Sequence, residues 1–211
     1  MDLMPQQLRA YLSSLAPDRP PELDAMEEHA REVGFPILGP VAGHFCYLIA
    51  RLMGARRVFE LGSGFGYSTA WFAKAVQENG GGEVYHVVWN EDLSSHARAR
   101  LDALGYSDVV RCVVGEAVDV LLDTPGPFDI VFNDIDKRRY PKSIPAIGRK
   151  LRSGGALIVD NALWHGWIFD QSDCSEDTKG VREATRILTT TPEWVTSVVP
   201  LQDGLLLAMK R

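Results

Sequence analysis

The amino-acid sequence predicts an α/β fold, a single doubly wound domain with a mostly parallel sheet of seven strands. Short apolar, β-branched runs alternate with helix-like stretches along most of the 211 residues, a pattern typical of parallel strands covered by helices on both faces. The last two runs are separated by a short turn, which indicates an antiparallel hairpin at the C-terminus. We therefore expect one domain over residues 1–211, in which residues 1–22 form an N-terminal helix and lid extension.

The order of the expected elements follows from hydrophobic periodicity and from turn residues. After a short helix and a turn in the first twenty residues, apolar residues recur at spacings of three and four over 43–53, which predicts a helix. Gly154 and Gly155 predict a turn before the fifth strand, and residues 202–204 predict the turn of the closing hairpin. The expected strands are 56–61, 83–89, 109–114, 128–134, 155–161, 194–200 and 204–210. The helices expected between them are 68–78, 93–104, 117–122, 140–151 and 181–190.

Composition narrows the classes of function. With 45% hydrophobic and 24% charged residues, the chain has the make-up of an ordinary globular protein. The net charge is -6 and the basic residues are scattered, so no surface for nucleic acid is expected. The apolar runs are too short to cross a bilayer, and the N-terminus lacks the apolar core of a secretion signal. Three widely separated cysteines favour a reducing compartment, so we expect a cytoplasmic protein that binds neither nucleic acid nor membrane.

A glycine-rich loop, within FELGSGFGYS at residues 59–68, follows the first strand. Gly62, Gly64 and Gly66 give the spacing G-x-G-x-G, not the G-x-G-x-x-G of dinucleotide-binding proteins. Glu60 precedes these glycines, and a carboxylate there would repel a pyrophosphate but attract a cationic ligand. S-adenosylmethionine has no phosphate and carries a sulfonium and an ammonium group, so it suits this loop. A purely structural glycine turn is the alternative interpretation.

The end of the second strand lacks a residue that nucleotide-bearing cofactors usually need. An acidic residue commonly binds the ribose hydroxyl groups at that point. This sequence has Val88 and Trp89 there, and the nearest polar residues are Asn90 and Glu91. Trp89 is a candidate for stacking on the adenine, with simple packing as the alternative.

Acidic residues follow two further strands. Asp134, Asp136 and Lys137 come at the end of the fourth strand, and Asp160 and Asn161 come at the end of the fifth. Since the carboxyl ends of parallel strands share one edge of a sheet, these oxygen-bearing side chains are expected to lie close together. Hard cations such as Mg²⁺ and Ca²⁺ prefer such ligands. The alternative is that each acid only caps the helix after it.

These motifs, in this order and spacing, resemble the cation-dependent O-methyltransferases that include the caffeoyl-coenzyme A and catechol enzymes. The resemblance runs from about Leu23 to the C-terminus and is carried by GARRVFELGSGFGYS, GEAV, FDIVFNDIDKRRYP, GGALIVDNALWHG and LQDGL. It implies a Rossmann-like methyltransferase domain that transfers a methyl group from S-adenosylmethionine to a hydroxyl group with the help of a divalent cation. Mg²⁺ is the expected cation, with Ca²⁺ or Mn²⁺ as alternatives.

The resemblance also implies roles for individual residues. Asp134, Asp160 and Asn161 would bind the cation. Lys137, next to Asp134 in the catalytic site, resembles the general base of the catechol enzyme. A lysine that is only paired structurally with its flanking carboxylates is the alternative. The residues expected to bind the cofactor are Leu38, Glu60, Gly62, Ser63, Gly64, Ser68, Trp89, Ala117 and Asp136.

The substrate side shows departures from the family. Asn133 stands where the family usually has an apolar strand residue, and the N-terminal extension is shorter than in plant members. His165 stands where plant members have an asparagine that contacts the substrate, with a plain loop histidine as the alternative. Trp164 and Trp167 are candidates to sandwich a planar acceptor, and packing in the core is the alternative for each.

The expected function is methyl transfer to a catechol-like or other vicinal-hydroxyl small molecule. A cation would bind two adjacent oxygens of such an acceptor and lower the pKa of its hydroxyl group. Two other functions stay open: a catalytically impaired relative that binds the cofactor, and a nicotinamide-dependent reductase, against which Glu60 argues. Because the family commonly forms homodimers, a homodimer acting on a hydroxylated aromatic acceptor is expected.

Overall fold

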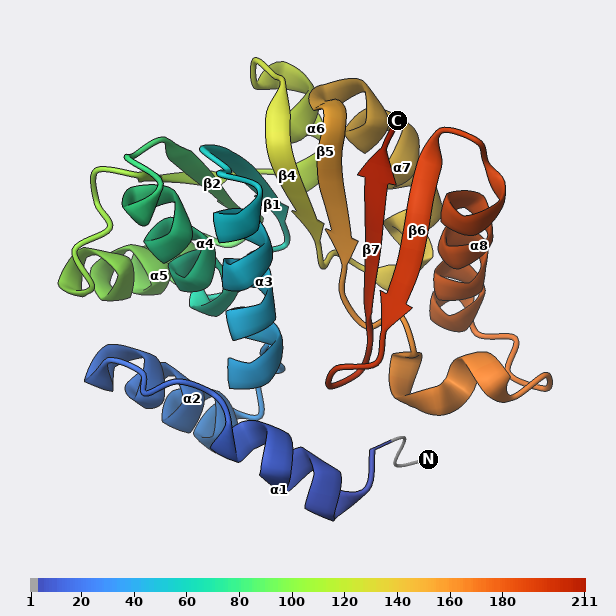
Figure 1. Ribbon diagram of the computed structural model, residues 1–211, viewed down its shortest axis with the longest axis horizontal. Coiled ribbons are helices and arrows are strands. Elements are labelled where there is room, and N and C mark those ends of the chain that lie inside the picture. The colour runs from blue at the N-terminus through green and yellow to red at the C-terminus, as the bar shows by residue number, and fades with distance from the viewer. Residues whose placement is uncertain (1–3) are drawn as a thin grey trace.

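The computed structural model describes residues 4–211 and contains a seven-stranded mixed sheet (Figure 1). The strands lie in the order β3-β2-β1-β4-β5-β7-β6. Neighbours among β1 to β5 pair in parallel, whereas β7 runs antiparallel to both β5 and β6. This sheet confirms the predicted fold class and the closing hairpin. The strands are β1 (Arg57–Leu61), β2 (Glu83–Val88), β3 (Val110–Val114), β4 (Phe128–Asn133), β5 (Leu151–Val159), β6 (Trp194–Val199) and β7 (Leu205–Lys210).

Helices cover both faces of the sheet and divide the core in two (Figure 1). The first cluster of buried side chains lies between the sheet and α2 to α5, and the second lies between the sheet and α6 to α8. Helix α1 buries none of its residues. The helices are α1 (Gln6–Ser14), α2 (Pro21–Val33), α3 (Pro40–Leu52), α4 (Tyr67–Glu78), α5 (Glu91–Ala103), α6 (Ala117–Asp123), α7 (Tyr140–Lys150) and α8 (Glu176–Thr190), with short 3-10 helices η1 (Lys137–Arg139) and η2 (Trp164–Phe169).

The N-terminal region contains more helix than expected. The predicted extension over residues 1–22 includes α1, but its first three residues lie outside the described range. Helix α2 follows directly and packs Leu23, Met26 and Ala30 into the core. In Figure 1, α1 and α2 lie beside α3, at the same edge of the sheet as the carboxyl ends of β4 and β5.

The turn expected at Gly154 and Gly155 is wrong. Strand β5 begins at Leu151, and both glycines lie within it. Pairing with β4 shifts register between Phe128 and Ile130, so extra β5 residues bulge out of the ladder. A side chain at position 155 would meet the backbone oxygen of Asp129 at 3.1 Å, which explains why glycine suits this bulge.

The strand order reverses between β1 and β4, and this switch point positions the candidate site. The parallel ladder continues past the strand ends, because the amide of Asp134 donates to Leu61 and that of Asp160 donates to Asn133. Residues that end β4 and β5 are thereby held side by side next to the glycine loop. No helix within residues 4–211 is long and apolar enough to cross a membrane.

Candidate active site

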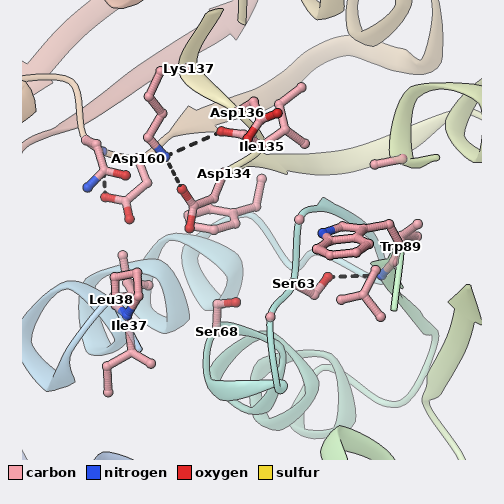
Figure 2. Close-up of a pocket in the computed structure, with 18 of the residues that line it drawn as sticks. Ile37, Leu38, Ser63, Ser68, Trp89, Asp134, Ile135, Asp136, Lys137 and Asp160 are labelled. Carbon is pink, nitrogen blue, oxygen red and sulfur yellow. Dashed lines mark hydrogen bonds and ion pairs between the residues drawn. The ribbon is translucent and has the colours of Figure 1, made fainter. Parts of the chain in front are cut away.

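A cavity of about 710 Å³ opens at this switch point (Figure 2). Its size is within the range of about 300–1,000 Å³ typical of small-molecule sites. With the exception of Glu60 and Trp167, all the site residues expected from the sequence line this one cavity. Their predicted roles remain predictions, but the structure brings them together. They are Leu38, Gly62, Ser63, Gly64, Ser68, Trp89, Ala117, Asp134, Asp136, Lys137, Asp160, Asn161, Trp164 and His165.

The glycine loop is clamped between β2 and β4. Gly62 has a φ of 83°, and a Cβ on it would lie 2.5 Å from the backbone oxygen of Asp134, so this position requires glycine. The hydroxyl oxygen of Ser63 accepts a hydrogen bond from the amide of Val87 at 3.0 Å. Ser68 lies in the first turn of α4 and borders the cavity. Contacts within the protein therefore hold the loop in its shape.

Glu60 is completely buried behind this loop and does not reach the cavity. Side chains alternate along a strand, and Glu60 shares a face of β1 with Val58 of the first core. Its carboxylate accepts a hydrogen bond from Thr69, and the Thr69 hydroxyl lies 2.9 Å from Nδ1 of His86. Burial raises the pKa of Glu60 to about 7 and lowers the pKa of His86 to about 4. Any influence of Glu60 on a ligand must therefore act through charge or through the loop.

The part of the cavity next to the end of β2 has no acidic residue in the last positions of that strand, as the sequence indicates. Val88 is buried, whereas Trp89 is 79% exposed and lines the cavity, so its ring is not packed in the core. The Asn90 side chain caps α5 by accepting from the amide of Leu93 at 2.9 Å. Glu116, also on the cavity wall, caps α6 with its carboxylate. In Figure 2 the indole ring of Trp89 lies on the Ser63 side, away from the acids at the ends of β4 and β5.

Carboxylates gather on the opposite wall (Figure 2). The Lys137 ammonium lies 2.6 Å from an Asp134 carboxylate oxygen, while Asp136 pairs with Arg138 at 3.4 Å. Burial raises the pKa of Asp134, and the neighbouring Lys137 opposes that rise. Burial, followed by the negative charge of Asp134, raises the pKa of Asp160 to about 8. Ionising both Asp134 and Asp160 would therefore leave more negative charge on this wall than its one lysine neutralises.

The donor set formed by Asp134, Asp160 and Asn161 suits a hard divalent cation. Asp134 and Asp160 raise the free energy of each other's ionised form, and a bound cation would remove that repulsion. Asn161 follows directly and also lines the cavity, so an amide oxygen is within the same wall. In the part of the chain that the structure describes, no three or more His, Cys, Asp or Glu side chains form a metal-binding group. This donor set has only two carboxylates, and its third member is an amide.

Two aromatic rings lie next to the Lys137 ammonium. Its ammonium lies 5.7 Å from the centre of the Trp164 ring and 5.2 Å from that of Tyr140. The indole nitrogen of Trp164 is buried without a hydrogen-bond partner. The expected sandwich of two tryptophans is wrong: Trp167 does not line the cavity and meets Trp164 edge to face, at an interplanar angle of 84°. His165 is on the cavity wall and is exposed.

Several residues that support the site are not among those expected from the sequence. The Tyr140 hydroxyl donates to the backbone oxygen of Asp160 at 3.1 Å and so holds the end of β5. Gly180 lets α8 approach the backbone of Lys137 so closely that a Cβ could not fit. Asn133, the departure noted in β4, is buried and donates to the Ser143 hydroxyl at 3.0 Å. Among these residues, only Asn133 gives a sequence signal, as a polar residue inside an apolar strand.

Comparison with known proteins identifies the family of this chain. The O-methyltransferase family matches residues 24–211. A catechol O-methyltransferase of Mycobacterium tuberculosis is 34% identical over 172 residues, which cover 80% of this chain and 77% of that protein. A catechol O-methyltransferase of Niastella koreensis is 29% identical over 184 residues, which cover 84% of this chain and 82% of that protein.

A solved structure resembles the whole chain. The O-methyltransferase TomG from Streptomyces achromogenes, crystallised in complex with SAM, aligns with a TM-score of 0.87 at 29% identity. The alignment covers 98% of this chain and 99% of TomG. Because the family match, the relatives and the fold all extend over most of the chain, this protein belongs to the O-methyltransferase family, as its motifs predicted.

Proposed function

We propose that this protein transfers a methyl group from S-adenosylmethionine to a hydroxyl group of a small aromatic acceptor, such as a catechol, with the help of a divalent cation. One observation carries the proposal. The carboxylates of Asp134 and Asp160, with Asn161 beside them, share a cavity with the glycine loop. A cofactor at the loop and an acceptor at the acidic wall would therefore lie next to each other.

The charge of the cavity supports the cofactor assignment. Five carboxylate residues line the cavity against two cationic residues, Lys137 and Arg139. Such a wall repels a pyrophosphate and favours a sulfonium. TomG, which shares the fold, was crystallised with SAM. Family membership also excludes a nicotinamide-dependent reductase. Leu38, Ser68 and Trp89 are the cavity residues proposed to contact the cofactor.

Asp134, Asp160 and Asn161 are proposed to hold the cation. Bound there, a divalent cation would lower the pKa of an acceptor hydroxyl group and orient neighbouring oxygens. Lys137 is proposed as the general base in its neutral amine form, which the charge of a bound cation would favour; its Nζ would then accept the hydroxyl proton, and the Asp134 carboxylate, 2.6 Å away, would stabilise the ammonium that forms. Trp164, which lines the cavity beside Lys137, is proposed to contact the ring of the acceptor. The remaining requirement is placement of the acceptor oxygen about 3 Å from the methyl carbon.

The proposal is tested by methyl transfer from labelled S-adenosylmethionine to a panel of catechols. Transfer is expected with Mg²⁺ and is expected to disappear with EDTA. A parallel thermal-shift experiment with S-adenosylhomocysteine measures cofactor binding, since a ligand at 100 times its Kd adds about 2.7 kcal/mol to the free energy of unfolding. A thermal shift without methylation of any acceptor would instead support a catalytically impaired relative that binds the cofactor, and absence of both would contradict the proposal.

A homodimer and a cytoplasmic location stay predictions. Strand β6 forms one edge of the sheet, and Val195 on it is exposed together with Met209, its cross-strand neighbour on β7. We propose these apolar side chains as the dimer interface. Light scattering coupled to size exclusion would give the mass of the wild-type protein, and Val195→Lys is expected to yield monomers.

A further inference from the structure

Unusual backbone conformations concentrate at one place in the structure. Within residues 4–211, the non-glycine residues with positive φ are Asn161, Trp164, His165 and Gln202, with φ values of 45–54°. Such conformations are unfavourable for residues with a side chain and persist only where the surroundings impose them. Three of these residues follow β5, and the fourth lies in the turn between β6 and β7. Since β6 runs parallel to β5, both segments lie at the same edge of the sheet (Figure 1).

Backbone hydrogen bonds join the two segments. The amide of Ala162 donates to Gly204 at 2.9 Å, and that of Leu163 donates to Asp203 at 2.8 Å. These bonds attach the loop after β5 to the hairpin turn without any side chain. They explain why the segments lie together, but they do not explain the position of the Asp203 carboxylate.

The Asp203 carboxylate accepts two hydrogen bonds, one on each oxygen, and its Oδ2 also lies 3.6 Å from Nδ1 of the His165 ring. Oδ2 accepts a hydrogen bond from the side-chain amide nitrogen of Asn161 at 3.1 Å. Oδ1 accepts from the backbone amide of His165 at 2.6 Å. The Asp203 side chain is only 15% exposed, so these two donors take the place of most of its water.

These contacts determine which way the Asn161 amide faces. A side-chain amide presents an oxygen on one side and an NH₂ group on the other, and an ionised carboxylate can only accept hydrogen bonds. The NH₂ group of Asn161 must therefore face Asp203. We propose that Asp203 is a positioning residue that holds the Asn161 amide with its oxygen, not its nitrogen, available to a divalent cation in the cavity. This inference rests on the cation site of the proposed function.

The inference can be tested by substitutions that exchange hydrogen-bond donors and acceptors while hardly changing the shape of the side chains. In Asp203→Asn, one carboxylate oxygen is replaced by an NH₂ group. If the new amide keeps its oxygen toward His165, its NH₂ group faces Asn161 and forces that amide to turn, so a nitrogen would then face the cation. Adding Asn161→Asp to this variant restores the pairing, because a carboxylate at position 161 accepts from the amide at 203 and still offers an oxygen to the cation.

Binding of Mn²⁺ to the protein without cofactor or acceptor provides the measurement, because free Mn²⁺ is quantified by its electron paramagnetic resonance signal. Residues that orient metal ligands typically affect affinity by about 10- to 100-fold. We expect a loss of that size for Asp203→Asn and recovery in the double variant. Asp108→Asn, the same change at an exposed position, is the control and is expected to bind like wild type.

The possible outcomes separate the two claims. Failure of the wild-type protein to bind Mn²⁺ would overturn the proposed cation site together with this inference. Wild-type affinity in a folded Asp203→Asn variant would overturn the positioning role alone. If the single variant does not fold, the double variant decides: a folded double variant that binds Mn²⁺ supports the role, and one that does not bind contradicts it. Circular dichroism establishes folding in each case.

Discussion

Replacing Glu60 with glutamine removes a negative charge that the fold buries behind the glycine loop. The side chain is fully buried, and its partners are the hydroxyl groups of Thr69, Ser68 and Ser63, with the neutral ring of His86 beyond Thr69. No cationic side chain is among the groups that alter the pKa of Glu60. Glutamine has nearly the same shape and can still accept from Thr69. The substitution therefore changes mainly the charge.

The expected effect on stability follows from the pKa of Glu60, which burial raises from 4.5 to about 7. At 1.36 kcal/mol per pKa unit, this difference amounts to about 3 kcal/mol. Below pH 4.5 the carboxyl group is protonated in both states and has no effect. As the pH rises from 4.5 to 7, the unfolded chain releases its proton first, so the free energy of unfolding falls. Above pH 7 the full destabilisation remains.

The assay is urea unfolding of the protein without ligands, for wild type and Glu60→Gln, at pH values from 5 to 8.5. We expect the variant to be more stable than wild type by about 3 kcal/mol at pH 8 and by less than about 1 kcal/mol at pH 5. Glu28→Gln, an exposed position on α2, is the control and should show no such pH-dependent gain. A stability difference that is the same at both pH values would refute the reasoning.

Three further predictions concern the cavity. Asp160→Asn is expected to eliminate Mg²⁺-dependent methyl transfer. It is also expected to stabilise the ligand-free protein at pH 9, because a buried carboxyl group with a pKa of about 8 no longer has to ionise. Full Mg²⁺-dependent turnover of the variant would argue against the role of Asp160 in binding the cation. Lys137→Ala should lower kcat by about 100-fold or more and change its pH dependence, and an unaltered pH–rate profile would remove Lys137 as the base. Trp89→Ala should weaken S-adenosylhomocysteine binding by about five- to tenfold, as expected for loss of one stacked ring; calorimetry giving the wild-type Kd would contradict stacking.

Much of the fold can be predicted because its determinants are local. The parallel strands and the helices between them each carry their own apolar periodicity and turn residues. Helix α2 is missing from the elements expected from the sequence, although Leu23, Met26 and Ala30 share one face and Gly34 ends the helix in a left-handed conformation. The β5 bulge resembles a turn in the sequence because glycine serves both purposes, and only pairing with β4 distinguishes them.

The candidate site is predictable where it depends on strand ends and not where it depends on distant contacts. Asp134 and Asp160 follow adjacent parallel strands, so their proximity follows from topology alone. Glu60 is expected in the cavity from its place beside the glycines, but the alternation of side chains along β1 turns it into the core. Asp203 lies some forty residues after Asn161, and no local pattern connects the two. Contacts of this kind depend on the register of the closing hairpin.

The most direct test of the central claim is an anomalous diffraction measurement on crystals grown with S-adenosylhomocysteine and Mn²⁺. We expect a Mn²⁺ peak bounded by oxygens of Asp134, Asp160 and Asn161, with the cofactor along the glycine loop in the same cavity. A cofactor bound elsewhere, or a cavity that holds the cofactor while these three side chains bind no Mn²⁺ at a saturating concentration, would contradict the account.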